Sequence, residues 1–292
     1  MSIAVTIAPA VSEWFDGNAR DLPWRRPGFT AWGTLVSEFM LQQTPVVRVI
    51  PRLDEWLERW PTPADLAAAS PGDAVRAWAS LGYPRRALNL HAAAVAITER
   101  HGGVVPEDVP SLLALPGIGD YTARAVAVFA YGHRHPVVDV NIRRVIARAV
   151  LGQGEPGPAA KRDLADMEAI LPESVADARR ANIAIMELGA VVCTARSPRC
   201  DDCPIASQCA WRLAGYPAFE GKRAAVQKKF AGSDRQVRGL ILAELRASDI
   251  PVTAGEIALV WALDEQRDRA LAGLLADGLV AATGADAYEL PG

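Results

Sequence analysis

The stretch LPGIGDYTARAV, residues 115–126, places two glycines one residue apart between two helix-like segments. After the glycines, small apolar residues recur at three- and four-residue steps from Ala123 to Ala130, so the second helix has a face that can pack closely on the first. The N–H groups of such a turn and of a helix N-terminus can point outward together, which suits a phosphate group. The stretch predicts helix, tight turn and helix, in which Gly117 and Gly119 either bind phosphate or only allow the turn.

The remaining chain also shows mostly helical patterns. Apolar residues recur at helical spacing across residues 10–100, and further helices are predicted near 160–171 and 177–192. Thr62 and Ser70 are candidate N-caps, and alternating strand-like patterns are scarce. These patterns predict an all-α fold class.

The composition changes near residue 216. The segment YPAFEGKRAAVQKKFAGSD is polar, basic and poor in helical patterns, and we interpret it as a linker. Three predicted helices and a short strand-like end follow it. We therefore predict a small winged-helix-like domain at the C-terminal end, a kind of domain that binds DNA or protein.

Bulk composition bounds the class of protein. The chain has 292 residues, enough for roughly two domains, and 50% of them are hydrophobic and 22% charged, as in a soluble globular protein. No apolar run reaches the roughly 18 residues of a membrane helix, and the N-terminal residues lack the basic start of a secretory signal. The formal charge of −3 does not favour a polyanion partner, but phosphate binding needs only a local patch. We expect a cytoplasmic protein without membrane association.

All four cysteines fall in one short window. They are Cys193, Cys200, Cys203 and Cys209, spaced C-x6-C-x2-C-x5-C. Four soft ligands on one loop indicate a metal centre rather than disulfides or unligated thiols. A structural zinc usually takes two close pairs, whereas only one pair is close here, so the spacing favours a [4Fe-4S] cluster over zinc.

Several polar residues stand out near predicted helix ends. Asp139 follows Tyr121 by 18 residues and directly precedes a helix, where an Asp is either an N-cap or a functional group, and Asn141 could cap similarly. Glu38 lies on a predicted helix with Gln42 one turn later on the same face. A lone helical Glu is usually solvated, but the neighbours of Glu38 are apolar; if it faces inward, its pKa should rise and suit a general acid.

Six motifs occur in order between about residues 11 and 212 and resemble the adenine DNA glycosylases of the MutY family. They are LPWR, SEFMLQQT, LGYPRRALNLH, LPGIGDYT, VDVN and ELGAVVC with its cysteine loop. The resemblance implies a helix-hairpin-helix DNA glycosylase fold, in which a six-helix barrel packs against a helical module that carries a [4Fe-4S] cluster.

The resemblance also implies a reaction. It is the hydrolysis of the N-glycosidic bond of adenine mispaired with 8-oxoguanine or guanine, after the adenine is swung out of the duplex. Glu38 would protonate the adenine, and Asp139 would stabilise the oxocarbenium-like sugar. Asn141 would orient Asp139, and Gln42 and Gln43 would fill the opened duplex.

Further residues are predicted to contact DNA. The candidates are Arg25, Arg85, Arg86, Leu115, Gly117 and Gly119. Arg143 and Arg144 are either phosphate contacts or a solvated helix face.

Tyr121 bears on whether the enzyme also cuts the DNA backbone. Relatives that do so form a Schiff base through a lysine that follows the glycine turn, and Tyr121 occupies that place here. The only lysines are Lys161, Lys222, Lys228 and Lys229. We therefore predict a glycosylase without lyase activity. Tyrosine also occurs at this place in thymine mismatch glycosylases, or it could simply pack the hairpin.

Two departures from the family pattern keep alternatives open. Pro84 stands where a second aromatic usually follows LGY, in a segment that touches the strand opposite the adenine. The Nudix-like domain that reads 8-oxoguanine is not recognisable, so the preference between 8-oxoguanine and guanine stays open. The alternatives are a thymine/uracil mismatch glycosylase and a non-catalytic iron–sulfur DNA-binding regulator.

The resemblance and the composition together predict four parts. Residues 1–27 and 135–215 form the iron–sulfur module, 28–134 the six-helix barrel with the helix-hairpin-helix, 216–233 the linker and 234–292 the winged-helix-like domain. The expected partner is double-stranded DNA with a mispaired adenine, bound by a monomer at the nucleoid.

Overall fold

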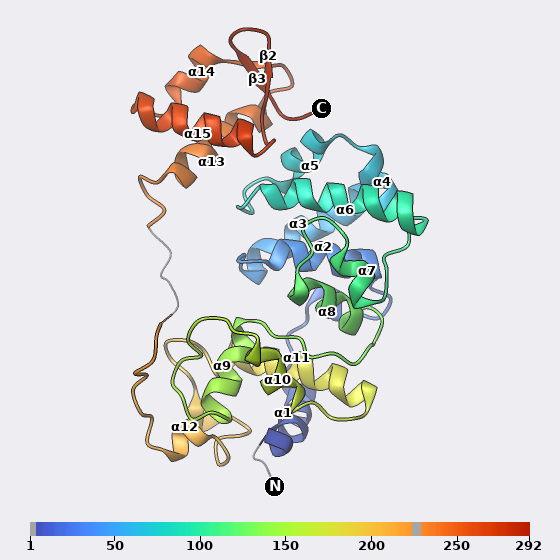
Figure 1. Ribbon diagram of the computed structural model, residues 1–292, viewed down its shortest axis with the longest axis vertical. Helices are drawn as coiled ribbons and strands as arrows, with labels where there is room; N and C mark the ends of the chain where they lie inside the picture. The colour runs from blue at the N-terminus through green and yellow to red at the C-terminus, as the bar shows by residue number, and fades with distance from the viewer. Residues whose placement is uncertain (1–3, 224–228) are drawn as a thin grey trace. The chain divides into compact units, whose positions relative to one another are not determined.

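The chain is predominantly helical, as the all-α prediction requires. Its structure is a computed structural model that describes residues 4–223 and 229–292. Figure 1 shows helices along the whole described chain and strands only near its C-terminal end. Among the described residues, no helix is both long and apolar enough to span a membrane.

The described residues fall into two compact units. The first contains residues 4–29, 107–109 and 119–223, and the second contains 30–106, 110–118 and 229–292. The predicted four parts have other boundaries than these two units, and the four-part division stays a prediction. Within it, residues 1–3 of the first part and 224–228 of the linker lie outside the described residues.

The first unit is built on α11. Its elements are α1 (Ala4–Asn18), η1 (Pro23–Arg25), α8 (Asp120–Phe129), α9 (Val140–Ala149), α10 (Arg162–Glu168), α11 (Val175–Val191), η2 (Cys200–Asp202) and α12 (Ala210–Leu213). Helix α11 packs against α1 and α9, and a shared core of Ile7, Val11, Ile142, Ile185 and Leu188 fills the space between them. Their burial is the main stabilising contribution in this unit.

Asn182 of α11 fixes the segment that leads into α9. Its side chain is fully buried, accepts the Val137 N–H at 2.9 Å and donates to the His135 carbonyl at 3.1 Å. A buried amide with both ends bonded holds its partners firmly, because breaking either bond would leave a buried polar group unsatisfied. The residues before Asp139 are therefore tied to the unit's central helix.

The second unit contains the helices that precede the glycine turn, from residue 30 onward, together with the C-terminal region. Its elements are α2 (Ala31–Leu41), α3 (Val46–Arg59), α4 (Pro63–Ala68), α5 (Pro71–Trp78), α6 (Arg85–His101), most of α7 (Val109–Leu113), α13 (Asp234–Ala247), β1 (Val252–Thr253), α14 (Ala254–Leu259), α15 (Asp264–Ala276), β2 (Ala281–Thr283) and β3 (Ala287–Glu289). Helix α6 packs on α4 and α5, as can be followed in Figure 1. Thr62 and Ser70 are N-caps, as predicted, since each side chain accepts the N–H of the residue three positions later.

The C-terminal region has three helices and a small antiparallel sheet. The strand order is β1-β3-β2, and Tyr288 of β3 pairs with Val252 on one side and Ala282 on the other. The three helices and the strand-like end were predicted, but β1 was not, because two residues are too few to show an alternating pattern.

Candidate functional site

Glu38 faces inward from α2. The helix starts at Thr30, whose side chain accepts the Gly33 N–H, and Glu38 is 6% exposed between the buried residues Val36 and Phe39. The sequence left this orientation open, since a lone helical Glu is usually solvated but the neighbours of Glu38 are apolar. The accompanying rise of its pKa and its role as an acid stay predictions.

The two glutamines follow at the end of the same helix. Gln42 is the C-cap of α2, and the exposed Gln43 adopts φ +55°, in the left-handed region that most side chains avoid. Helix α2 therefore ends in a tight tip that presents Gln43 to solvent.

Asp139 is the N-cap of α9 and is bonded through both oxygens. Its Oδ1 accepts the Ile142 N–H at 2.7 Å, and its Oδ2 accepts the side-chain amide of Asn141 at 2.7 Å. Burial raises the pKa of the Asp139 carboxyl above its usual value, although these hydrogen bonds and the nearby Arg144 oppose the rise. Capping thus fixes the carboxylate without excluding a chemical role for it.

Asn141 is itself held from two sides. Its Oδ1 accepts Arg144 Nη2 at 2.7 Å, and Arg144 also donates to the carbonyls of Gly189, at 2.6 Å, and Cys193, at 2.6 Å. A Cβ on Gly189 would lie 2.7 Å from the Cβ of Asn141, so only glycine lets α11 approach this closely. A continuous set of contacts therefore joins Asp139 to the start of the cysteine loop.

The glycine turn is formed as predicted. Gly117 has φ +73°, and a Cβ there would lie 2.5 Å from the Asn89 side chain; Gly119 is the N-cap of α8. Leu115 is 3% exposed, and its carbonyl accepts the Ile118 N–H at 3.3 Å. Tyr121, in the first turn of α8, is half-buried and packs against a small cluster that includes Ala125 and Val128.

The three predicted arginine contacts have different surroundings. The Arg25 side chain donates to the fully buried Glu187 carboxylate at 2.8 Å. Arg86 is only 7% exposed, whereas the Arg85 side chain is 66% exposed and lies 3.3 Å from Asp277. Of the three, Arg85 is the most accessible to a phosphate.

Glu187 is a buried carboxylate that sequence reasoning did not single out. Arg20 donates to it at 2.7 Å and Arg25 at 2.8 Å. Although burial opposes the shift, these bonds lower the pKa of Glu187 to about 2. The signal available in the sequence was an acid inside the ELGAVVC motif, two residues before Gly189.

The residues therefore form two groups. Asp139, Asn141 and Tyr121 belong to the first unit, and Glu38 with the two glutamines belongs to the second. The side chains of the first group lie in the first turns of α8 and α9, and those of the second group lie in and directly after α2. The glycine turn is the covalent connection from the second unit to α8.

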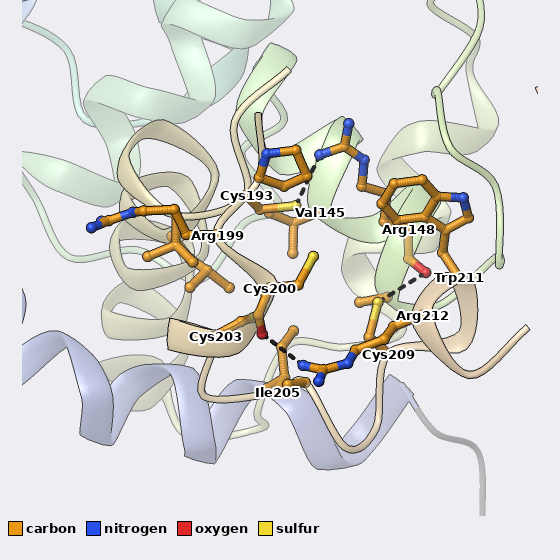
Figure 2. A pocket seen from close by; sticks show the side chains of 15 residues that line it. Val145, Arg148, Cys193, Arg199, Cys200, Cys203, Ile205, Cys209, Trp211 and Arg212 are labelled. Atoms are coloured by element: carbon orange, nitrogen blue, oxygen red, sulfur yellow. Dashed lines mark hydrogen bonds between the residues drawn. The ribbon is translucent and has the colours of Figure 1, made fainter. Parts of the chain in front are cut away.

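The four cysteines line one cavity of the first unit. Figure 2 shows the sulfur atoms of Cys193, Cys200 and Cys209 around a common space, and the residues that line the cavity include Cys203. All four thiols are half-buried and none forms a disulfide. Among the described residues, no three His, Cys, Asp or Glu side chains converge closely enough to hold a single metal ion, so the thiols are spread around the cavity.

Arginines surround this donor set. Arg148 Nη1 lies 3.4 Å from the Cys193 sulfur, and its guanidinium lies 4.9 Å from the centre of the Trp211 ring. Burial, with a further contribution from the other cysteines, raises the pKa of the Cys203 thiol to about 11. Four thiolates placed here need compensating positive charge, which an iron–sulfur cluster and the adjacent arginines together provide. The residues present therefore fit such a cluster.

Arg148 was also missed by the sequence reasoning. It lies one helical turn after Arg144 on α9, so both arginines face the cysteine loop. Arg144 is therefore half-buried and does not lie on a solvated helix face. Arg143 is also half-buried, and its Nε donates to Asp163 at 2.8 Å.

Comparisons with known proteins agree with this geometry. The model of the HhH-GPD superfamily base excision DNA repair proteins matches residues 36–173, and that of the iron–sulfur binding domain of endonuclease III matches residues 193–209, which contain all four cysteines.

Two relatives match along almost the whole chain. The adenine DNA glycosylase of Mycobacterium tuberculosis is 53% identical over 281 residues, which cover 96% of this chain and 91% of that protein. The adenine DNA glycosylase of Mycolicibacterium smegmatis is 54% identical over 290 residues, which cover 99% and 97%. Among solved structures, a thermostable thymine-DNA glycosylase has a TM-score of 0.66 at 25% identity and covers 73% of this chain and 97% of that one.

Proposed function

Because the chain belongs to the adenine DNA glycosylases of the helix-hairpin-helix superfamily, we propose that Glu38 and Asp139 are its two catalytic carboxyl groups. It is a DNA-binding hydrolase of base excision repair that removes adenine, and its cysteine loop binds a [4Fe-4S] cluster, not zinc. Its proposed substrate is adenine mispaired with 8-oxoguanine or guanine in double-stranded DNA.

The proposed first step is bond cleavage assisted by an acid. Glu38, in its protonated form, gives a proton to a ring nitrogen of the flipped adenine, so that the base can leave as a neutral molecule. The electrons of the N-glycosidic bond stay with the base, and positive charge develops on the sugar. The burial of Glu38 supports this role, because an apolar environment favours the neutral carboxyl.

The proposed second role belongs to Asp139. Its carboxylate stabilises the positive charge on the sugar until water attacks the sugar carbon that carried the base. The attacking water then loses a proton to a carboxylate. The observation that carries the proposal is the two-sided attachment of Asp139 to the Ile142 N–H and the Asn141 amide. Both bonds hold the carboxylate in one orientation, so it needs little reorganisation as charge develops.

The decisive experiment is a single-turnover panel of duplexes. It uses A opposite 8-oxoguanine, A opposite G, T opposite G and U opposite G, with the wild type, Glu38→Gln and Asp139→Asn. We expect removal of adenine only, and large losses in both variants. Removal of thymine or uracil would indicate a mismatch thymine/uracil glycosylase, and an inactive wild type that binds DNA would indicate a regulator.

We propose that the enzyme does not cut the DNA backbone. The first 160 residues contain no lysine, and Tyr121 follows the glycine turn where a Schiff-base lysine would stand. Borohydride should therefore trap no covalent enzyme–DNA adduct, while adenine release proceeds. Efficient trapping would contradict this prediction.

Further parts of the proposal concern the setting. We propose that Gly117 and Gly119 bind a phosphate, that Arg85 contacts DNA, and that the enzyme works as a monomer at the nucleoid in the cytoplasm. We also propose that residues 216–233 form a linker and that residues 234–292 form a winged-helix-like C-terminal domain. Sedimentation of the enzyme with and without duplex would test the monomer.

A further inference from the structure

Arg86 is a buried cation that closes the end of α2. The residue is 7% exposed, and its Nη1 lies 2.7 Å from the carbonyl of Phe39, 3.1 Å from that of Met40 and 2.5 Å from that of Gln42. The last carbonyls of a helix have no partners within the helix, and a cation is favourable at this end. Arg86 therefore holds the turn from which Gln42 and Gln43 emerge.

The same guanidinium holds a second loop. Its Nη2 donates to the Gly82 carbonyl at 2.9 Å and to the Thr44 hydroxyl at 3.0 Å. The guanidinium carbon lies 5.4 Å from the ring centre of Tyr83 and 5.2 Å from that of Trp78, within the range of cation–π interactions. One side chain thus joins the end of α2 to the Gly82–Tyr83 loop.

Both loops contain a strained residue at their tips. Gln43 has φ +55° and Tyr83 has φ +49°, and neither is a glycine. Such backbone conformations are unfavourable for residues other than glycine, and they persist where surrounding contacts fix them. The exposed Gln43 and the 39% exposed Tyr83 therefore emerge next to one shared, rigid anchor.

We infer that Arg86 is a positioning residue that sets the Gln42–Gln43 tip and Tyr83 as one rigid element for opening the duplex, and that it does not contact phosphate. The inference rests on the proposed role of the two glutamines at the DNA.

The bonding of Arg86 argues against a phosphate contact. Its two terminal nitrogens serve five acceptors, and its Nε is buried without a hydrogen-bond partner among the described residues. A phosphate could be bound only if these bonds were broken. Burial lowers the pKa of Arg86 to about 10, which still leaves the charge in place at neutral pH.

The test compares Arg86→Met and Arg86→Lys with two other arginine variants. Arg85→Met removes an exposed neighbour and reports how a phosphate contact behaves. Arg59→Met is the matched control, because Arg59 also lies over a tryptophan ring, Trp60 at 4.4 Å, but is bonded to Asp73 on the surface. Melting temperature and cluster absorbance establish that each variant is folded.

Three quantities are measured on the folded proteins. They are the single-turnover rate of adenine removal at saturating enzyme, the salt dependence of Kd for a duplex with a non-hydrolysable adenosine analogue, and the fluorescence of a 2-aminopurine placed next to the target adenine. The last reports unstacking of the duplex independently of bond cleavage.

For Arg86→Met we expect a rate about 100-fold lower, because a misplaced positioning group can cost that much. The 2-aminopurine signal should be lost, and the salt slope should match the wild type. Arg86→Lys should recover only part of the rate, since a point charge cannot replace the planar fork. Arg59→Met should match the wild type throughout.

Two results would overturn the inference. A salt slope reduced by about 0.9 at an unchanged saturated rate would make Arg86 a phosphate contact. A lower melting temperature with an unchanged rate would make it structural only. A wild type that removes no adenine would refute the proposed function instead, and the 2-aminopurine signal would still decide the role of Arg86.

Discussion

At the residue scale, Asp139 combines an observed structural role with a proposed chemical one. It caps α9 through one oxygen and accepts the Asn141 amide through the other. Because burial raises its pKa, ionised Asp139 costs folding stability at neutral pH, and this cost disappears as the pH falls through the raised pKa. The role proposed for Asp139 needs the charged form, so on this proposal function and stability oppose each other here.

Asp139→Asn should therefore separate the two. We expect a rate of adenine removal at least about 100-fold lower, because the sugar cation loses its charge partner. We also expect a melting temperature close to that of the wild type at pH 7.5, because Asn caps helices nearly as well as Asp and removes the cost of a buried charge, which offsets the lost bond from the Asn141 amide. Relative to this variant, the wild type should gain stability as the pH falls through the raised pKa of Asp139. A clearly lower melting temperature at pH 7.5 would count against the stated cost of burial.

Asn141→Leu should change the pH dependence of the reaction. The Asn141 hydrogen bonds lower the pKa of Asp139, so their removal should raise it further. Since Asp139 is proposed to act as a carboxylate, the acid limb of the single-turnover rate should move to higher pH. A pH–rate profile with the wild-type limb, at any lower rate, would show that Asn141 does not influence this titration.

At the scale of elements, the contact between α9 and α11 positions the Asp139 group. Gly189 on α11 contacts Asn141 at the start of α9. Arg144 of α9 joins the two helices, because it donates to both the Asn141 side chain and the Gly189 carbonyl. Asn182, two helical turns earlier on α11, fixes the segment that precedes α9. A single helix, α11, thus holds the chain both before and after Asp139.

Gly189→Ala should weaken this contact. Its Cβ would lie 2.7 Å from the Asn141 Cβ and 2.8 Å from the Asn141 carbonyl, so the helices must separate. We expect a loss of about 1–3 kcal/mol in the free energy of unfolding, with slower adenine removal. Gly239→Ala, in α13, is the control: nothing lies within 4 Å of its Cβ, so this variant should gain stability. Equal effects of the two substitutions would contradict the packing argument.

At the scale of the whole molecule, the C-terminal region is bound to α5 within the second unit. The Gly72 N–H donates to the Pro291 carbonyl at 2.7 Å, and Arg246 Nε donates to the Val75 carbonyl at 3.0 Å. Arg76 donates to the Ser248 carbonyl at 3.0 Å. Through these contacts the C-terminal region supports α5, which packs on α6, the helix that contains Arg86.

Arg246→Met should therefore destabilise the protein. Burial lowers the pKa of Arg246 to about 10, and the lost bond to Val75 leaves a carbonyl without its charged donor. We expect about 1.5–3 kcal/mol less free energy of unfolding in urea. Arg269→Met is the control, because Arg269 is 61% exposed and pairs with Asp234 at the surface, where such pairs contribute little to stability. Similar losses in both variants would rule out a special role for the buried contact.

The sequence by itself determined the features that depend on local spacing. The cysteine window, the glycine turn, the helical periodicity and the absence of lysine before residue 161 each follow from the order of residues, and they predicted the fold class and the cluster. The caps at Thr62 and Ser70 were predictable for the same reason, since a cap bonds within its own turn.

Only the tertiary structure decided which way the arginines point. Arg25, Arg86 and Arg144 lie in motifs that suggest DNA contacts, but their partners are Glu187, the end of α2 and the cysteine loop. A guanidinium can bind phosphate, carboxylate or helix carbonyls equally well, so residue type cannot distinguish these partners. The distinction depends on groups brought together from distant parts of the chain by packing.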